Sequence, residues 1–159
     1  LVFNMNEIIS KIFKAGLHGE NTHLHPNKAL QDLSAEKARK KPSPNVSSCW
    51  EILHHIAVWQ KFCLELIKGN KPRWETVKEE EWPSQERLSE DTEWDGLVSK
   101  FKKDLQETAE LAGSIDPMKP MPGWRNAPAI QALLMLAQHN SYHLGQIVTI
   151  RKTLGYWSL

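Results

Sequence analysis

Two histidines four residues apart, His139 and His143, are the pair in this sequence best suited to metal chemistry. They lie in a long segment whose apolar residues recur with helical spacing. Four residues make about one helical turn, so both imidazoles project from the same flank, which they share with Ala132 and Ile150 on the core side. An i,i+4 pair of imidazoles can therefore reach a single divalent ion.

A third inward-facing histidine is expected on a different helix. Apolar residues and cysteines recur every seven positions along residues 49–66 and mark the core side of that helix. At 100° per residue, this stripe places His55 toward the core and the adjacent His54 toward solvent. The sequence thus predicts a metal site at His55, His139 and His143, with coordination positions left for water or substrate.

Two other interpretations of these histidines stay open. A single inward histidine such as His55 is commonly a core residue satisfied by one hydrogen bond, and many H-x3-H pairs bind no metal. Three buried imidazoles without a ligand would, however, leave several ring nitrogens unpaired, at a cost of about 1–3 kcal/mol each. A metal-free helical interaction protein would be favoured if the three imidazoles lay far apart.

The residues next to the H-x3-H pair narrow the chemistry. Asn140 occupies the position where a metalloprotease of the H-E-x-x-H type carries its general base, so that class is excluded. Gln146 lies on the flank of the two histidines and is expected either to bond a coordinated water or to lie on the rim. Gly145 costs about 1 kcal/mol relative to Ala inside a helix, which indicates close packing against a neighbouring helix.

Other reactive side chains are expected to have structural roles. Glu51 lies three residues after Ser48, the spacing of a capping box, although it also lies one turn before His55. Cys49 and Cys63 are 14 residues apart on one helix, about 21 Å, which is too far for a disulfide. Buried thiols are the expected state of both cysteines, with a catalytic thiol as the alternative.

Three further histidines and most tryptophans fall in predicted connections. The three histidines, His18, His23 and His25, are expected in a solvated loop. If that loop covers the bundle, the alternative is that His18 or His25 contacts the substrate. The tryptophans are expected to cover the bundle ends: Trp74, Trp82, Trp124 and Trp157.

Four long helices are predicted to position these residues. They are expected from about Asn4 to Ala15, from Ser47 or Ser48 to Gly69, from Ser89 to Ala112, and from Ala127 to Leu154. The first connection, 18–44, is long and includes short helical pieces, whereas residues 70–88 are predicted to be a loop. No segment alternates apolar and polar residues as a strand would. The predicted fold is all-α, a four-helix bundle with a long first connection.

Length and charge exclude several classes of protein. A chain of 159 residues fits one domain, 1–159. Its 20 Lys and Arg balance 19 Asp and Glu without a basic cluster, which argues against nucleic-acid binding. No apolar run reaches the ~20 residues of a membrane span, and the stretch before Phe13 carries charges and lacks a signal cleavage site. A cytoplasmic protein without membrane contact is expected.

Two motifs resemble those of the DinB-like family. Residues 48–59 match its S-x-W-E-x-x-x-H-I-x-x-W element, residues 139–147 match its H-x-x-Y-H-x-G-Q-I signature, and residues 81–83 also fit the family pattern. The resemblance implies a four-helix bundle, a homodimer and a three-histidine metal site carried here by His55, His139 and His143. Family members include S-transferases and isomerases that use low-molecular-weight thiols. The family often has Asp where Asn140 stands.

Together these observations predict a divalent-metal-dependent enzyme, thiol S-transferase-like or hydrolase-like, that acts on a small molecule. The ion, Zn²⁺, Ni²⁺, Fe²⁺ or Mn²⁺, would activate a water or a low-molecular-weight thiol cosubstrate. The alternative is a non-catalytic metal- or small-ligand-binding module whose histidines stabilise the bundle. An open coordination position facing a pocket would favour the enzyme, because structural metal sites are usually closed.

Overall fold

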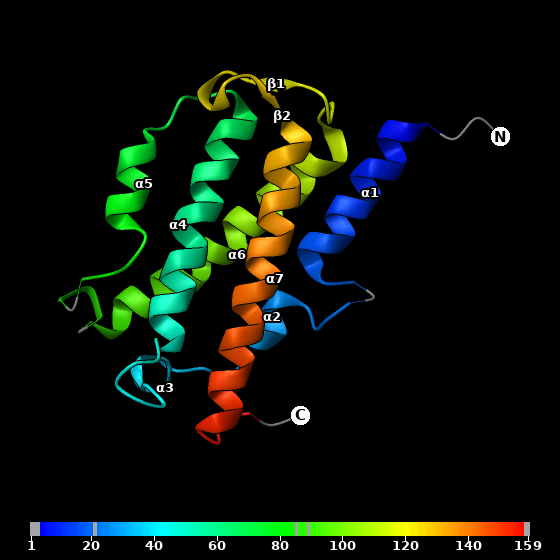
Figure 1. Ribbon diagram of the computed structural model, residues 1–159. Coiled ribbons are helices and arrows are strands. Elements are labelled where there is room, and N and C mark those ends of the chain that lie inside the picture. The colour runs from blue at the N-terminus through cyan, green and yellow to red at the C-terminus, as the bar shows by residue number, and fades with distance from the viewer. Residues whose placement is uncertain (1–3, 21, 85, 89, 158–159) are drawn as a thin grey trace.

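The structure, a computed structural model, is an all-α bundle, and it describes residues 4–20, 22–84, 86–88 and 90–157 (Figure 1). Its four long helices are α1 (Met5–His18), α4 (Cys49–Lys68), α6 (Asp91–Ser114) and α7 (Ala129–Thr153). The short elements are α2 (Pro26–Ala29), α3 (Ala35–Arg39), α5 (Trp74–Glu80), the 3₁₀ turns η1 (Glu86–Leu88) and η2 (Pro122–Trp124), and the strands β1 (Pro120–Met121) and β2 (Ala127–Pro128).

The long first connection exists because α1 and α4 occupy opposite corners of the bundle. Each of these two helices packs against both α6 and α7. The chain therefore crosses one end of the bundle between them, and the short helices on the way cover that end (Figure 1). There α2 packs on α7, and α3 packs on α4 and α6.

Local sequence signals account for the ends of α4. Ser48 and Glu51 form the predicted capping box, in which each side chain accepts a backbone hydrogen bond from the other residue. At the other end Gly69 takes a left-handed conformation, with φ of 97°, and terminates the helix. Because both signals lie within one turn of the helix ends, they were readable from the sequence alone.

The first helix is longer than predicted. It continues past Ala15 to His18 and ends at Gly19, whose φ is 74°. Gly16, the predicted stop, lies inside the helix, where a Cβ would lie 3.5 Å from the Cβ of Ala137 on α7. Gly16 is thus a point of close contact between two helices, and Gly19 is the cap.

Three other boundaries differ from the prediction. The predicted loop 70–88 contains α5 and η1, and α6 continues through Gly113. Ser89, the predicted N-cap of α6, lies outside the described residues. Ala127 is not helical: it pairs with Met121 in a two-residue antiparallel ladder, a pairing between distant residues that local periodicity does not reveal.

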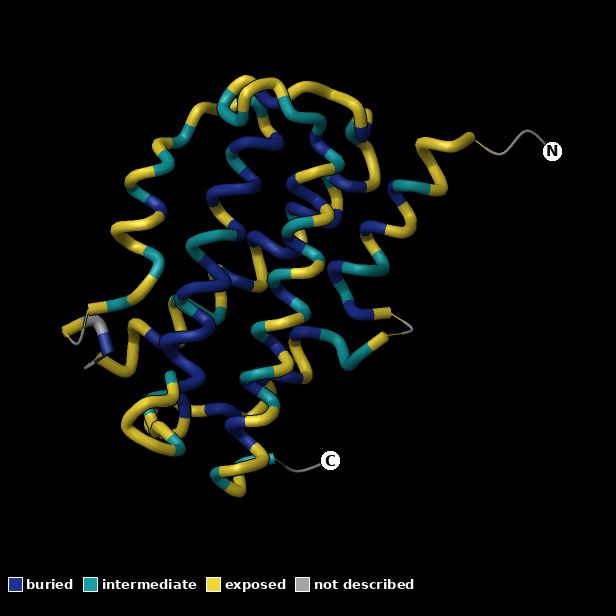
Figure 2. Tube along the Cα trace, in the orientation of Figure 1, coloured by how far each residue is buried: buried dark blue, intermediate teal, exposed yellow. Residues whose placement is uncertain are grey.

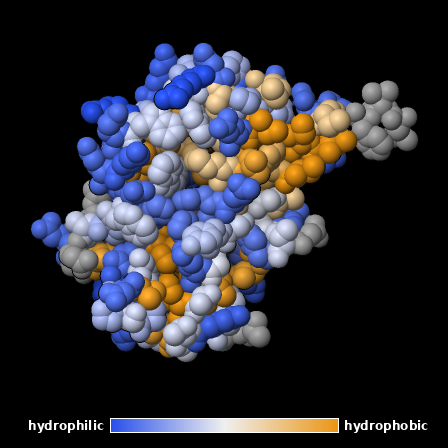
Figure 3. Space-filling model, in the orientation of Figure 1, coloured by the Kyte–Doolittle hydropathy of each residue, from blue (hydrophilic) through white to orange (hydrophobic). Residues whose placement is uncertain are grey.

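Large side chains from all four long helices form the core. Figure 2 shows the buried residues along these helices, and Figure 3 shows apolar surface over α1, where Met5, Ile8 and Ile12 are exposed. The rings of Trp50 and Trp94 lie 5.4 Å apart, and the Trp94 indole nitrogen donates to the Leu33 carbonyl, 2.8 Å away. Trp74 packs on Trp124 at 5.5 Å, so these two tryptophans do cover a bundle end. Within the described part of the chain, no helix has the length and apolarity that crossing a lipid bilayer requires.

Candidate metal centre

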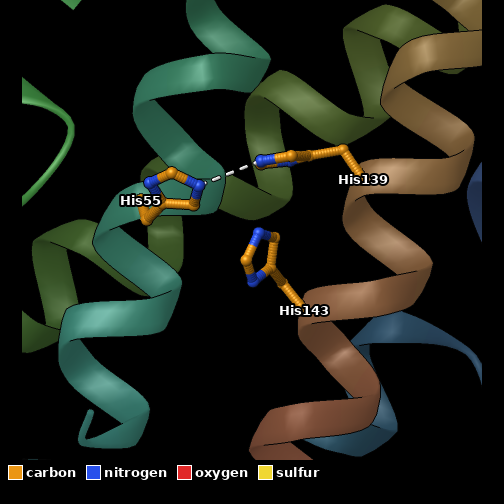
Figure 4. Close-up of side chains that lie close together, drawn as sticks. All are labelled: His55, His139 and His143. Atoms are coloured by element: carbon orange, nitrogen blue, oxygen red, sulfur yellow. Dashed lines mark hydrogen bonds between the residues drawn. The ribbon is translucent and has the colours of Figure 1, made fainter. Parts of the chain in front are cut away.

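The structure brings the three predicted histidines together. His55 projects from α4, and His139 and His143 project from successive turns of α7 toward it (Figure 4). The Nε2 atoms of His55 and His139 are 3.1 Å apart, and one nitrogen from each of the three rings lies within 4.8 Å of the others. In Figure 4 a ring nitrogen of His143 points into the gap between the other two rings.

This spacing fits the donor set of one metal ion. Two imidazole nitrogens bound to a first-row ion at about 2.0–2.1 Å lie roughly 2.8–3.4 Å apart in octahedral or tetrahedral geometry. The observed separation of 3.1 Å between the Nε2 atoms of His55 and His139 falls in that range. Without an ion, one of these rings must donate its Nε2 hydrogen to the other.

The surroundings of the cluster favour the neutral form of two of its imidazoles, those of His55 and His139. Burial, with the neighbouring His143 and His55, lowers the pKa of His139 to about 4. Burial also lowers the pKa of His55, which is 8% exposed, and His143 adds to this effect while the Glu81 carboxylate opposes it. A neutral imidazole has a lone pair for a metal ion, so these two residues are available as ligands at pH 7.

Gln146 fixes the tautomer of His143. Its Oε1 atom is 2.7 Å from His143 Nδ1, and an amide oxygen can only accept, so Nδ1 carries the hydrogen. Nε2, the nitrogen farther from the backbone, is then the one that can coordinate an ion. Of the two roles expected for Gln146, the structure fits the residue on the rim, since Gln146 lines a cleft and its amide is hydrogen-bonded. That hydrogen bond also orients a histidine, as residues next to metal ligands commonly do.

Glu81 and Trp82 cover His55, a role that the spacing of residues did not predict. The Trp82 ring stacks on the His55 imidazole, with centroids 4.5 Å apart and planes 15° from parallel. A Glu81 carboxylate oxygen lies 3.7 Å from His55 Nδ1 and accepts a hydrogen bond from the Trp59 indole nitrogen at 3.0 Å. The one available signal was the resemblance of residues 81–83 to a family pattern.

A buried amide pair lies behind the cluster. Asn140 Nδ2 donates to Gln60 Oε1 at 2.9 Å, and Gln60 Nε2 donates to the Phe101 carbonyl at 3.0 Å, which links α7 to α4 and α6. Both amide side chains are almost fully buried. Gln60 was also missed, although a polar residue at a buried position of an amphipathic helix is a readable signal.

His54 lies outside the cluster, as predicted, but it does not lie free in solvent. Its Nε2 atom is 2.8 Å from the Glu80 carbonyl at the end of α5, and the residue is half-buried. The prediction of a solvated His54 is wrong because α5, which the sequence analysis treated as loop, packs beside it.

Four of the other candidate residues have structural roles. His25 Nδ1 accepts from the Asn27 amide and caps α2, and His23 Nε2 is 2.8 Å from Ser141 Oγ, so His23 links the first connection to α7. Cys49 and Cys63 are buried free thiols, and burial raises the pKa of each to about 12, so neither supplies a thiolate at neutral pH.

A cleft of about 720 Å³ opens beside His143. Gly145 and Gln146 line it together with Trp82. A Cβ at Gly145 would meet no atom within 4 Å, so the expectation of close helix packing at this glycine is wrong. The cleft gives a small molecule access to the side of the cluster that His143 forms.

Comparison with known proteins identifies the family. The chain matches the family model of the DinB superfamily over residues 27–147, which include all three histidines of the cluster. Among curated proteins and among solved structures, no match is found. On the strength of the family match, the chain belongs to the DinB superfamily.

Proposed function

We propose that this protein is a divalent-metal-dependent enzyme whose ion is held by His55, His139 and His143. The observation that carries the proposal is the 3.1 Å separation of two Nε2 atoms from different helices, with the third imidazole directed at the same gap. Imidazole ligands suit Zn²⁺, Ni²⁺ and Fe²⁺, and the donor set does not distinguish these three ions; Mn²⁺ prefers oxygen ligands and would be held more weakly.

An open cleft next to the cluster favours catalysis over a purely structural role. Structural metal sites are closed by four protein ligands, whereas catalytic sites keep positions for substrate. Within the described residues, the only group of three or more potential ligands is this one, with three members. The cleft beside His143 would bring a small-molecule substrate to the positions that remain.

The residues around the cluster have definite tasks in this proposal. A bound divalent ion supplies chemistry by lowering the pKa of a coordinated thiol or water, so that a nucleophile forms near neutral pH. Gln146 holds the hydrogen of His143 on Nδ1 and so presents Nε2. Trp82 covers one face of His55 and limits the access of water to that ring. We propose a low-molecular-weight thiol or water as the nucleophile.

Metal analysis and two simple reactions test this function. The chain is purified without a nickel column, and its metal content is measured by mass spectrometry; about one divalent ion per chain is expected in the wild type and little in His143→Ala. Consumption of small thiols with 1-chloro-2,4-dinitrobenzene, and hydrolysis of p-nitrophenyl acetate, are then compared with and without metal.

The outcomes separate the proposal from its alternatives. Metal-dependent turnover that His143→Ala abolishes supports the enzyme. One ion per chain with neither reaction above background indicates a non-catalytic metal-binding module. A wild-type protein that neither retains nor takes up a divalent ion overturns the metal site itself.

A further inference from the structure

The cleft beside His143 is built by segments that are distant in the sequence. Residues 45–47 before α4 form one side, Trp82 after α5 forms another, and α7 forms the third. Its volume of about 720 Å³ is typical of a site for a small organic molecule. His143 lies in its wall, so a molecule in the cleft lies directly against the proposed metal site.

Gly145 leaves space in this cleft that packing does not explain. A glycine inside a helix destabilises it by about 1 kcal/mol relative to Ala. Gly145 gives no compensating helix contact, because a Cβ there would meet nothing within 4 Å. It lies two residues after His143, and any larger side chain at this position would extend into the cleft.

Two exposed aromatic side chains line the cleft. Trp82 is 48% exposed and Tyr142 is 66% exposed, so both rings offer surface to a ligand in the cleft. Trp82 already stacks on His55 with one face, and Tyr142 contacts the His143 ring at 4.9 Å. Stacking of a flat apolar ligand against these rings would remove their surface from water.

The rest of the lining is apolar or neutral. Ile52 and Ile150 add aliphatic surface, and amide and hydroxyl groups are present for hydrogen bonds. Among the described residues that line the cleft, none is Arg, Lys, Asp or Glu. In the protein without its proposed ion, a carboxylate or phosphate bound there would lose hydration without gaining an ion pair from an Arg or Lys side chain, which is costly.

We propose that this cleft binds the part of the substrate that lies away from the ion, as an uncharged aromatic group with hydrogen-bonding substituents, positioned between Trp82, Tyr142 and Gly145. This inference names the substrate class of the proposed enzyme and rests on that function for its catalytic meaning. The binding preference itself depends only on the cleft, so it is testable without the metal.

A pair of probes of the same shape tests the preference. Naphthalene-2-carboxamide and naphthalene-2-carboxylate differ in charge and little else, and each is titrated into the full chain after EDTA treatment, so that carboxylate–metal bonds do not contribute. The carboxamide is expected to bind at least tenfold more tightly at pH 7. Gly145→Leu, which fills the cleft, should weaken carboxamide binding at least tenfold.

Gly113→Leu is the matched control, because Gly113 is also an exposed helical glycine without a neighbour within 4 Å, on α6 instead of α7. It should leave carboxamide binding unchanged. Any of three results overturns the inference. The carboxylate binds as tightly as the carboxamide or more tightly, the carboxamide does not bind up to its solubility limit, or Gly145→Leu binds the carboxamide as tightly as the wild type does. Light scattering measures the oligomeric state in each titration. If the wild type is a dimer that binds no carboxamide and Gly145→Leu is a monomer, a second copy of the chain covers the cleft, and this result also overturns the inference.

Metal titration of the same variants keeps the two proposals separate. Gly145→Leu and the wild type should take up Zn²⁺ with equal stoichiometry, because Gly145 supplies no ligand. A wild type that binds the carboxamide but no metal contradicts the proposed enzyme alone. A wild type that binds metal but shows no preference for the carboxamide contradicts the substrate class alone.

Discussion

His55 Nε2 lies 3.1 Å from His139 Nε2, although 84 positions of sequence separate the two residues. The contact joins α4 to α7, two helices of the bundle that pack directly on each other. Two neutral imidazoles at this distance either share one hydrogen or face one cation. Metal content and the substitution of groups that hold the two rings in place distinguish these states.

Replacing His55 should remove bound metal, whereas replacing the adjacent His54 should not. His55→Ala deletes one of three proposed ligands, and its effect should exceed the roughly 10- to 100-fold typical of residues that only support a ligand. His54→Ala should cost about 0.5–1.5 kcal/mol of stability through its lost bond to the Glu80 carbonyl. Metal content by mass spectrometry and unfolding in urea measure both effects. Loss of metal in His54→Ala with retention in His55→Ala would refute the site.

Gln146 should matter for metal affinity although it is not a proposed ligand. Gln146→Leu keeps the size of the side chain but removes the acceptor that holds the hydrogen on His143 Nδ1. Zinc affinity, measured by competition with a chelating dye, should fall about 10- to 100-fold. Gln138→Leu, an exposed glutamine on the same helix, is the control and should change nothing. An unchanged affinity in Gln146→Leu would show that the tautomer of His143 needs no partner.

Acid should destabilise the metal-free protein through the histidine cluster. Burial with two neighbouring imidazoles lowers the pKa of His139 to about 4, against about 6.5 in an unfolded chain. Between these values the unfolded state binds more protons, so this contribution to stability is fully present above about pH 6.5 and is lost as the pH falls toward 4. Thermal unfolding in EDTA at a series of pH values should show this decline, reduced in His139→Gln. A midpoint that rises on acidification would contradict the prediction.

Two glycine substitutions should have opposite signs. Gly145→Ala adds a methyl group in open space and replaces a poor helix former, so stability should increase by about 0.5–1 kcal/mol. Gly19→Ala places a Cβ 2.5 Å from the His23 ring in a left-handed conformation with φ of 74°, and should destabilise the protein by at least about 1 kcal/mol. Urea denaturation measures both. A destabilised Gly145→Ala would mean that the glycine has a packing role after all.

Asn140→Asp should destabilise this chain. The substitution replaces the NH₂ group that donates to Gln60 Oε1 with a carboxylate oxygen, so two acceptor oxygens face each other. The side chain at this position is 2% exposed, so water does not separate them. Gln60 cannot reorient to donate without giving up its bond to the Phe101 carbonyl. A loss of about 1–3 kcal/mol is expected in urea denaturation at pH 7. An unchanged midpoint would show that the amide pair adapts freely.

The sequence alone determined the helical faces. The 3.6-residue period is a local property of the backbone, so apolar spacing was enough to orient His55 inward and to place His139 and His143 one turn apart. The capping box of Ser48 and Glu51 was likewise readable, because it joins residues three positions apart.

Only the tertiary structure decided what surrounds those faces. Three contacts join segments that are far apart in the chain: His55 with His139, Trp82 with His55, and Asn140 with Gln60. The open space at Gly145 likewise depends on which distant segments lie near it. Helical periodicity fixes how a residue is rotated about its own helix axis. It does not fix which turn of another helix lies opposite, because that depends on how all the buried side chains pack together.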